Sequence, residues 1–448
     1  MQTMTNSFLK FIDLHTLDKW YVSFYLNPNN LKSSYKFIKL KELIKPIKEK
    51  IKLADYKGDL RVVKKISFND GKIHIREENE TKMDLYTLYP KDLLVSKINF
   101  HQGALALNNY DKIVCTTHYQ PYSIDRELVI DEYLILALRN SKFQKHLDFL
   151  RADGIKNEAT SEFIGELEIP LPSLSEQKSI LDKYNQKINE SIKSFRRINE
   201  IECEIVKYFQ SVLGIDEKKN FELKKGLNLI EFTNLSKWSL NHINKDAYDF
   251  ESAKFKTERV KNLLTFFEGG KTPSKTRSDF WDGDIYWTSP KDFNGRISIE
   301  KAEDKITKLA VKEAGMKVYP KGIFLSVFRS GILQHSFPTA ITEIETAINQ
   351  DLKAYSLKED LIDKYYYLYF VHTFKKYILS LASKKSVTVE SINTEDFFEI
   401  PIPLPPKHIQ NEIALNISNL INKIEKLKLY AFDLKKEAEN QFEKAIFS

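Results

Sequence analysis

Two similar proline-rich motifs, each followed by a long stretch without proline, constrain this chain more than any other feature. Residues 168–177 read EIPLPSLSEQ and residues 399–410 read EIPIPLPPKHIQ, about 230 residues further on. About 40 residues of helical pattern follow each motif. A repeat of this length indicates a duplicated architecture. We therefore predict two related halves with a pseudo-two-fold arrangement.

Further landmarks recur in the same order in both halves. They are LDKW at 17–20 and LSKW at 235–238, LKELI at 40–44 and VKNLL at 260–264, and DLLVS at 92–96 and GIFLS at 322–326. Between these landmarks the halves differ, and the loop GGKTPS at 269–274 has no counterpart in the first half. A shared frame with different loops predicts two related domains that recognise different things.

Each proline motif leads into a predicted long helix with an apolar stripe. In residues 173–213 the stripe positions alternate by three and four, as in a coiled coil, and eight of ten are apolar. They are Leu181, Tyr184, Ile188, Ser191, Phe195, Ile198, Glu202, Ile205, Phe209 and Val212. In the last helix they are Ile413, Ile417, Leu420, Ile424, Leu427, Ala431, Leu434, Ala438, Gln441 and Ala445. Ser175-Glu176-Gln177 is predicted to cap the first helix.

A helix of about 41 residues is about 60 Å long and cannot bury such a stripe alone. We predict that the two helices pair with each other in antiparallel fashion. The alternative is that each helix packs as a core helix on its own domain. The predicted organisation is a recognition domain at 1–168, a long helix at 169–213, a linker at 214–234, a second domain at 235–399 and a second helix at 400–448.

Both domains are predicted to be mixed α/β. The expected strands are 61–63, 72–75, 93–96, 113–117, 285–288, 323–327 and 340–342, and the expected helices are 131–150 and 360–381. The second of these helices has an aromatic face, which we interpret as core packing.

Composition excludes several classes of protein. Of 448 residues, 42% are hydrophobic, so a disordered chain is not expected. Two cysteines give neither a disulfide framework nor a zinc site, and they suit a reducing cytoplasm. No run of 18 apolar residues predicts a membrane span, and the first 20 residues do not resemble a signal peptide. The net charge of +7 permits nucleic-acid binding without requiring it.

Catalytic motifs are not found in the sequence. Gly269-Gly270-Lys271-Thr272 resembles the end of a phosphate-binding loop, but Thr265 stands where that motif needs glycine. No Asn-Pro-Pro-Tyr motif for base methylation occurs, and no His or Cys cluster has metal-ligand spacing. We predict a recognition protein that itself catalyses nothing and binds no cofactor or metal.

The loop 270–277 is the strongest candidate for contact with DNA. It combines glycine, hydroxyl groups and three cations, which suit phosphate oxygens. Amides such as those of Asn349 and Gln350 suit adenine edges. The candidate DNA-binding residues of the second half are Lys271, Thr272, Ser274, Lys275, Arg277, Lys291, Asp292, Arg296, Arg329, Ser330, Asn349, Gln350, Lys384 and Lys385. Those of the first half are Ser96, Lys97, Asn99, His101, Gln102, Tyr119 and Lys156.

The ordered set of motifs resembles the specificity subunits of Type I restriction–modification systems. The resemblance covers nearly the whole chain and rests on IPLP at 169–172, IPIP at 400–403, GGKTPS at 269–274, IYWTSPKDF at 285–293 and AINQ at 347–350. It implies two target-recognition domains separated by two antiparallel helices, and a non-catalytic subunit that reads a bipartite site in double-stranded DNA.

The resemblance also implies partners. Two methyltransferase subunits and additional restriction subunits would join the chain, so that the complex acts as an adenine-specific DNA methyltransferase and ATP-dependent endonuclease. Those partners would use S-adenosylmethionine, ATP and Mg²⁺. The sequence departs from the family pattern where the second proline motif lacks Ser-Glu-Gln, and where the first half lacks the GGTPS-type loop.

Three alternatives remain open from the residues. The chain could be a fused methyltransferase or nuclease, although the catalytic motifs are absent. It could be a coiled-coil scaffold with two protein-binding heads. It could also serve another restriction–modification type whose partner fuses methyltransferase and nuclease.

Overall fold

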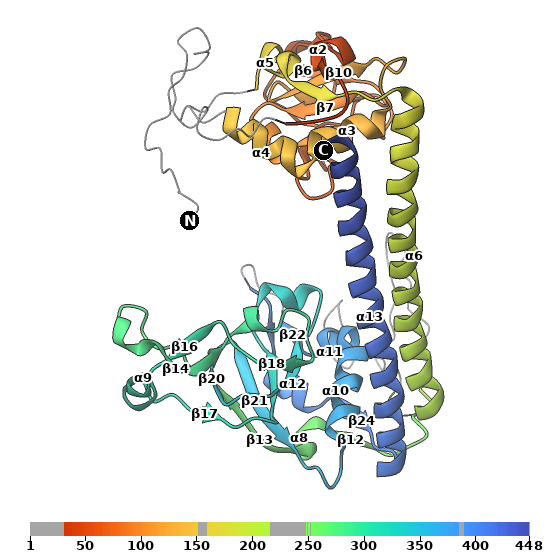
Figure 1. The fold of residues 1–448 in the computed structure, drawn as a ribbon. Helices are drawn as coiled ribbons and strands as arrows, with labels where there is room; N and C mark the ends of the chain where they lie inside the picture. Colours follow the sequence, from red (N-terminus) through yellow and green to blue (C-terminus); the bar gives the residue numbers. More distant parts are fainter. Residues whose placement is uncertain are drawn as a thin grey trace, which may run out of the picture. The chain divides into compact units, whose positions relative to one another are not determined.

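A computed structural model of the chain describes residues 31–150, 159–215, 248, 250, 252–384 and 389–447, without the side chains of 148–150. The chain divides into two compact units (Figure 1). Unit 1 comprises residues 1–195 and 429–448, and unit 2 comprises residues 196–428. The landmarks at 17–20 and 235–238, and all of the predicted linker after Ile215, lie outside the described residues. We call the parts of the two units outside their long helices the first and second domains.

The first domain is built on a four-stranded sheet in the order β2-β10-β7-β8. A three-stranded sheet β3-β6-β9, the hairpin β4-β5 and the pair β1-β11 complete it. The strands are β1 Phe37–Lys39, β2 Ile44–Pro46, β3 Lys50–Ile51, β4 Val63–Ile66, β5 Ile73–Ile75, β6 Leu85–Leu88, β7 Leu93–Ser96, β8 Leu105–Leu107, β9 Ile113–Thr116, β10 Tyr119–Ile124 and β11 Glu168–Pro170. The helices are α2 Leu40–Leu43, η2 Leu53–Asp55, η3 Phe100–Gln102, α3 Asp131–Arg139, α4 Ser141–Leu150 and α5 Ser161–Glu166.

The second domain repeats the frame in a five-stranded sheet of order β13-β21-β18-β19-β15. A four-stranded sheet β16-β14-β20-β17 and the pairs β12-β24 and β22-β23 complete it. The strands are β12 Thr257–Arg259, β13 Leu264–Gly269, β14 Trp281–Thr288, β15 Ser298–Ile299, β16 Asp304–Ile306, β17 Val318–Tyr319, β18 Phe324–Val327, β19 Thr339–Thr342, β20 Thr346–Ile348, β21 Leu352–Leu357, β22 Ser383–Lys384, β23 Ser391–Ile392 and β24 Pro401–Pro403. The helices are α8 Val260–Leu263, η5 Ser278–Phe280, η6 Pro290–Asp292, α9 Lys308–Glu313, η7 Gly331–Gln334, α10 Lys364–Thr373, α11 Lys375–Ala382 and α12 Thr394–Phe398.

The main sheets share one strand order, which confirms the duplicated mixed α/β fold. The order β2-β10-β7-β8 in the first domain corresponds to β13-β21-β18-β19 in the second, and β15 is added by parallel pairing with β19. The predicted strands are found within a few residues. The largest difference is at β14, which begins at Trp281 and not at the predicted 285, while β4 begins only at Val63 and Val62 forms an isolated bridge to Val114.

Both predicted domain helices are interrupted. The segment 131–150 breaks at Asn140, whose backbone is extended and whose side chain accepts a hydrogen bond from Lys142 N. The segment 360–381 begins later, at Lys364, because the side chain of Asp363 caps it. It breaks at Phe374, with φ −98° and ψ 22°. The aromatic face is core, as predicted, and Tyr366, Tyr367 and Phe370 are fully buried.

Two 40-residue helices, α6 Leu174–Leu213 and α13 Lys407–Ile446, contribute one part of their length to each unit. In unit 1, Lys187 forms an ion pair with Glu437, and the Ser191 hydroxyl donates to Ala431 O at 2.9 Å. In unit 2, Asn416 Nδ2 donates to the Tyr208 hydroxyl at 2.7 Å. Residue numbers rise on one helix as they fall on the other, so the predicted antiparallel pairing is confirmed.

The buried stripe of α6 departs from the predicted positions after Ser191. Phe195 is 40% exposed and Glu202 is exposed, whereas Ser194 and Ile201 are buried in their place. Two successive steps of three residues, from Ile188 through Ser191 to Ser194, interrupt the alternation of three and four and shift the contact face. These positions correct the strict alternation drawn from the sequence.

The C-terminal end of each helix packs on a domain core. In unit 1, Phe442 of α13 contacts the Tyr133 ring, with centroids 5.8 Å apart. In unit 2, Phe209 of α6 contacts Tyr366 at 6.2 Å in the equivalent way. Phe442 and Ile446 thus take the buried places predicted for Gln441 and Ala445. No helix among the described residues is long and apolar enough to cross a membrane.

The proline motifs form edge strands before the helices begin, so the predicted segments 169–213 and 400–448 each include a strand, while α6 begins one residue after the start of the helical pattern at 173. β11 pairs with β1, where Pro170 faces Phe37, and β24 pairs with β12, where Pro403 faces Thr257. Pro170 therefore corresponds to Pro403. The true copy of IPLP 169–172 is 402–405, two residues beyond the IPIP aligned from the sequence. Proline suits these strands because it needs no ladder hydrogen bond at an edge.

Two buried glutamines anchor the helices to their domains in the same manner. Gln177 accepts from Ile130 N at 2.8 Å, and its amide donates to Leu128 O and Pro172 O. Gln410 accepts from Asp363 N at 2.7 Å, and its amide donates to Leu361 O and Pro405 O. Each amide is thus satisfied by backbone groups, as a buried polar group requires.

These contacts correct two predictions about the helix starts. Gln177 does not cap α6, because Ser173 and Glu176 form the cap: Ser173 N donates to the Glu176 carboxylate at 2.9 Å. The second motif keeps its glutamine despite lacking Ser-Glu-Gln, because Gln410 makes the contacts of Gln177.

Candidate nucleic-acid interface

In the second domain, the loops that follow β13, β14, β18 and β20 meet along one edge. Lys271 N donates to Ile348 O at 3.0 Å, which joins the loop after β13 to the end of β20. Asn349 N donates to Thr288 O at 3.1 Å and joins the loops after β20 and β14. The Thr272 hydroxyl also donates to the side chain of Gln350. The structure thus brings the loop 270–277 and the segment 349–351 together.

The edge continues through the loop after β18. Phe328 N donates to Asp351 O at 2.8 Å, and Ser330 N donates to Glu390 O at 3.1 Å. Lys384 lies on β22, which pairs with β23 opposite Ser391. We call the connected segments 270–277, 289–296, 328–331, 349–351, 384 and 389–391 the recognition edge. Lys385, like Lys156 of the first domain, lies outside the described residues.

Gly270 is required by close packing. A Cβ atom at this position would lie 2.1 Å from Ile348 O and 2.4 Å from Asn349 O. Two indoles fasten the loop further, since Trp287 Nε1 donates to Lys271 O and Trp281 Nε1 to Ser274 O, both at 3.1 Å. Close packing and two hydrogen bonds therefore fasten the loop to its neighbours.

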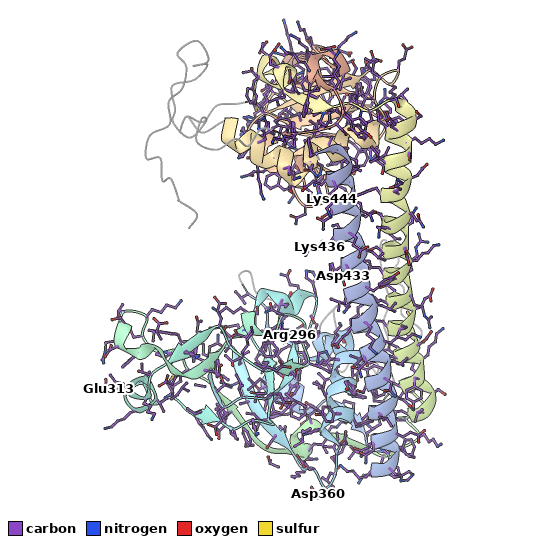
Figure 2. All side chains as sticks on the ribbon, in the orientation of Figure 1. Arg296, Glu313, Asp360, Asp433, Lys436 and Lys444 are labelled. Carbon is purple, nitrogen blue, oxygen red and sulfur yellow. The ribbon has the colours of Figure 1, made fainter. Side chains whose placement is uncertain are left out.

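Some predicted cations already have carboxylate partners. Arg277 donates to Asp279 at 2.6 Å and to Glu313 at 3.1 Å, and the hydrogen bonds to Asp279 and Glu313 raise the pKa of the guanidinium. Figure 2 shows Glu313 on α9. Lys291 lies 3.0 Å from both Glu303 and Asp304, which raise the pKa of its ammonium. Two carboxylates beside one cation leave a locally negative group, which does not attract phosphate.

Other predicted cations are free. Lys271, Lys275 and Arg296 are exposed, and no carboxylate of the described residues forms an ion pair with them. Figure 2 places Arg296 on the loop after β14. These three, with exposed Lys384, are the residues of the recognition edge best suited to phosphate.

Two predicted contact residues have structural roles. Asp292 accepts from Ser289 N at 2.8 Å and from Glu303 N at 2.9 Å, so both carboxylate oxygens are engaged in capping. Asn349 is 6% exposed, and its Oδ1 accepts from Asp351 N at 3.0 Å. Ser330 and Ser274 accept from nearby backbone amides, while exposed Gln350 faces outward beside Thr272.

The first domain has an equivalent edge with different residues. Lys97 N donates to His118 O at 3.0 Å, as Phe328 N does to Asp351 O. Ala159 N donates to Lys97 O at 2.7 Å, as Ile392 N does to Phe328 O at 2.8 Å. The predicted residues of the first half therefore occupy the place of the loop after β18.

Those first-domain residues form a compact group. Ser96 is buried and accepts from Asn99 N at 3.2 Å, and Gln102 N donates to Asn99 O. His101 lies between them on η3, where it is half-buried. Ser96, Asn99 and Tyr119 line a cavity of about 270 Å³, together with residues of β4 and the turn after it.

The model of the Type I restriction modification DNA specificity domain matches residues 32–203 and again residues 253–431. The chain belongs to this family. The two matches cover most of the chain and coincide with its two halves, so each half is one specificity-domain copy.

Curated relatives of the specificity-domain family support the assignment. The chain is 30% identical over 215 residues to the Type I restriction enzyme EcoR124I/EcoR124II specificity subunit of Escherichia coli, which covers 48% of this chain and 50% of that protein. It is 31% identical over 163 residues to the MjaIX specificity subunit of Methanocaldococcus jannaschii, covering 36% of each. The chain thus spans at most half the length of these relatives.

A solved structure shows the fold alone. It is described as the structural basis underlying complex assembly and conformational transition of the type I R-M system. The likeness has a TM-score of 0.56 at 17% identity and covers 93% of this chain and 98% of that one.

Sequence reasoning missed the partners that fix the specificity-domain frame. Gln177 and Gln410 carry equivalent contacts, but the two-residue difference in motif spacing concealed their correspondence. The contact of Asp351 with Arg329 was not predicted, because the two residues are 22 positions apart in the sequence. The AINQ motif directly before Asp351 was the signal, since Asn349 and Asp351 bind each other.

Proposed function

We propose that this chain is the DNA-recognition subunit of a Type I restriction–modification complex. Each domain reads one half of a bipartite site in double-stranded DNA, and the chain itself catalyses neither methylation nor cleavage. The proposal places it in the cytoplasm, where the DNA is.

The observation that carries the proposal is the equivalent edge in the two domains. The same backbone contacts, Lys97 N to His118 O and Phe328 N to Asp351 O, hold different side chains at the same place. A duplicated frame that varies only in its loops suits a protein that reads two different DNA half-sites with the same architecture. In the second domain free cations supply phosphate contacts, and fixed polar groups beside them supply contacts to base edges.

We further propose that two methyltransferase subunits bind the chain and that restriction subunits join them for cleavage. Those partners would supply the chemistry of S-adenosylmethionine, ATP and Mg²⁺. The family match and the names of both curated relatives support the Type I assignment over a system with a fused partner.

The test is to map methylated adenines across the genome of cells that carry the intact system, with this gene present and with it deleted. A bipartite motif should be methylated only when the gene is present. Methylation that persists without the gene, or a motif with one continuous part, would contradict the proposal. The purified chain alone should transfer no methyl groups.

A further inference from the structure

Arg329, in the loop after β18, is held in place by Asp351. Its Nε donates to Asp351 Oδ1 at 2.6 Å, and its backbone N donates to Asp351 O at 3.2 Å. Asp351 Oδ2 in turn accepts from Asn349 Nδ2 at 3.2 Å. Both carboxylate oxygens are thus engaged, and the guanidinium has a fixed position on the recognition edge.

The terminal nitrogens of Arg329 remain available. No hydrogen bond of theirs is found among the residues that the structure describes, and the side chain is 55% exposed. A planar guanidinium presents its donors in a rigid arrangement. Guanine presents two acceptors, O6 and N7, side by side in the major groove, and a bidentate arginine is the commonest specific contact to them.

The surroundings of Arg329 favour a base over a phosphate. The 21% exposed carboxylate of Asp351 balances its charge and would repel a phosphate brought to the same place. Phosphate contacts are better served by free Lys271, Lys275 and Arg296 on neighbouring loops. The Asp351 carboxylate should weaken a contact with guanine little, because guanine is neutral. The hydrogen bonds to guanine depend on how the guanidinium is oriented, and the carboxylate fixes that orientation.

We propose that Arg329, oriented by Asp351, reads a guanine in the half-site bound by the second domain. The proposal rests on the proposed DNA-reading function. It assigns Asp351 a positioning role and Arg329 the specificity-determining contact. In the first domain, exposed Ile98 follows Lys97 as Arg329 follows Phe328, so that domain has no donor at this place.

The experiment uses the full-length chain co-purified with methyltransferase subunits and a randomised duplex library. Wild type should enrich a bipartite motif with a guanine in one half. Arg329→Ala should lose the preference for that guanine by roughly 5- to 140-fold and leave the other half-site unchanged. Arg329→Lys keeps the charge without the planar donors, so it should lose the same preference. Arg296→Ala is the matched control and should weaken all sequences alike.

A modified base tests which atom of the guanine Arg329 contacts. Replacing the guanine by 7-deazaguanine removes the N7 acceptor, which should weaken wild-type binding and leave Arg329→Ala unaffected. Equal penalties in both proteins would overturn the assignment, as would uniform weakening of all sequences by Arg329→Ala or an unchanged motif in a folded variant. Wild type that enriches no motif would instead contradict the proposed function itself. Asp351→Asn should reduce the guanine preference less than loss of Arg329.

Discussion

The two domains share a backbone frame and differ where that frame ends. Glu166 binds Lys39 and Lys41 in the first domain, and Glu399 binds Arg259 and Lys261 in the second. The Tyr133 and Tyr366 hydroxyls each donate to a motif proline carbonyl at 2.7 Å.

At the recognition edge, by contrast, the two domains carry different residues at equivalent places. The first domain has Lys97, Ile98 and His118, and the second has Phe328, Arg329 and Asp351 in the same order. The contacts that fix the helix to its domain are repeated, whereas the groups that would meet DNA are not. The duplicated chain thus keeps its assembly constant and varies its chemistry.

The largest effect is expected from Gly270→Ala, which tests whether the loop unique to the second domain is fixed by close packing. The new methyl group would meet backbone oxygens of Ile348 and Asn349, so the free energy of unfolding of the second domain should fall by about 3 kcal/mol. Denaturant unfolding measures it. Gly331→Ala is the matched control, because nothing lies within 4 Å of its added methyl group. Equal stability of the two variants would show that the loop is not tightly packed.

The anchoring glutamines should behave alike in both domains. Gln177→Ala and Gln410→Ala each leave three backbone groups without their partner, at a cost of about 2 kcal/mol. Hydrogen exchange should accelerate at the Ile130 amide in the first variant and at the Asp363 amide in the second. A large effect from only one of them would break the equivalence of the two frames.

A buried histidine should make the stability of the second domain depend on pH. Burial lowers the pKa of His372 to about 4, and its Nε2 lies 2.6 Å from Thr339 O. Below pH 6.5 the unfolded chain binds a proton that the folded domain does not, so stability falls as pH falls towards 4. The loss should be about 1 kcal/mol at pH 5.5 and absent from His372→Gln. If His372→Gln left the dependence of stability on pH unchanged, His372 would not be its source.

The smallest effect separates free from paired cations on the recognition edge. Lys275→Ala should reduce the slope of log affinity against log salt by about 0.9, because a phosphate contact is lost. Arg277→Ala should change the slope little, because Asp279 and Glu313 already neutralise the guanidinium. Identical slopes for both variants would show that free Lys275 and carboxylate-paired Arg277 do not differ in their contact with phosphate.

Sequence patterns predicted what depends on periodicity and repetition. The apolar stripes predicted the antiparallel helices, and the repeated landmarks predicted the duplicated mixed α/β domains. The predicted alignment of the two proline motifs was wrong by two residues, because IPLP at 169–172 resembles both 400–403 and 402–405. Backbone pairing of Pro403 with Thr257 settles the choice.

The state of the candidate cations was beyond the sequence. Arg277 and Glu313 are 36 positions apart, and only α9 brings the carboxylate to the loop. Asp292 and Asn349 were predicted as contacts because their residue types suit DNA. Their side chains also cap and brace the neighbouring turns, and these roles depend on contacts that no local pattern reveals.

The most direct test of two independently reading domains is to replace residues 235–399 by the corresponding domain of a relative and to map methylated adenines in cells. The account predicts a new bipartite motif in which one half-site changes and the other half-site and the spacing are retained. Methylation in which both half-sites change, or in which the original motif persists, would contradict it.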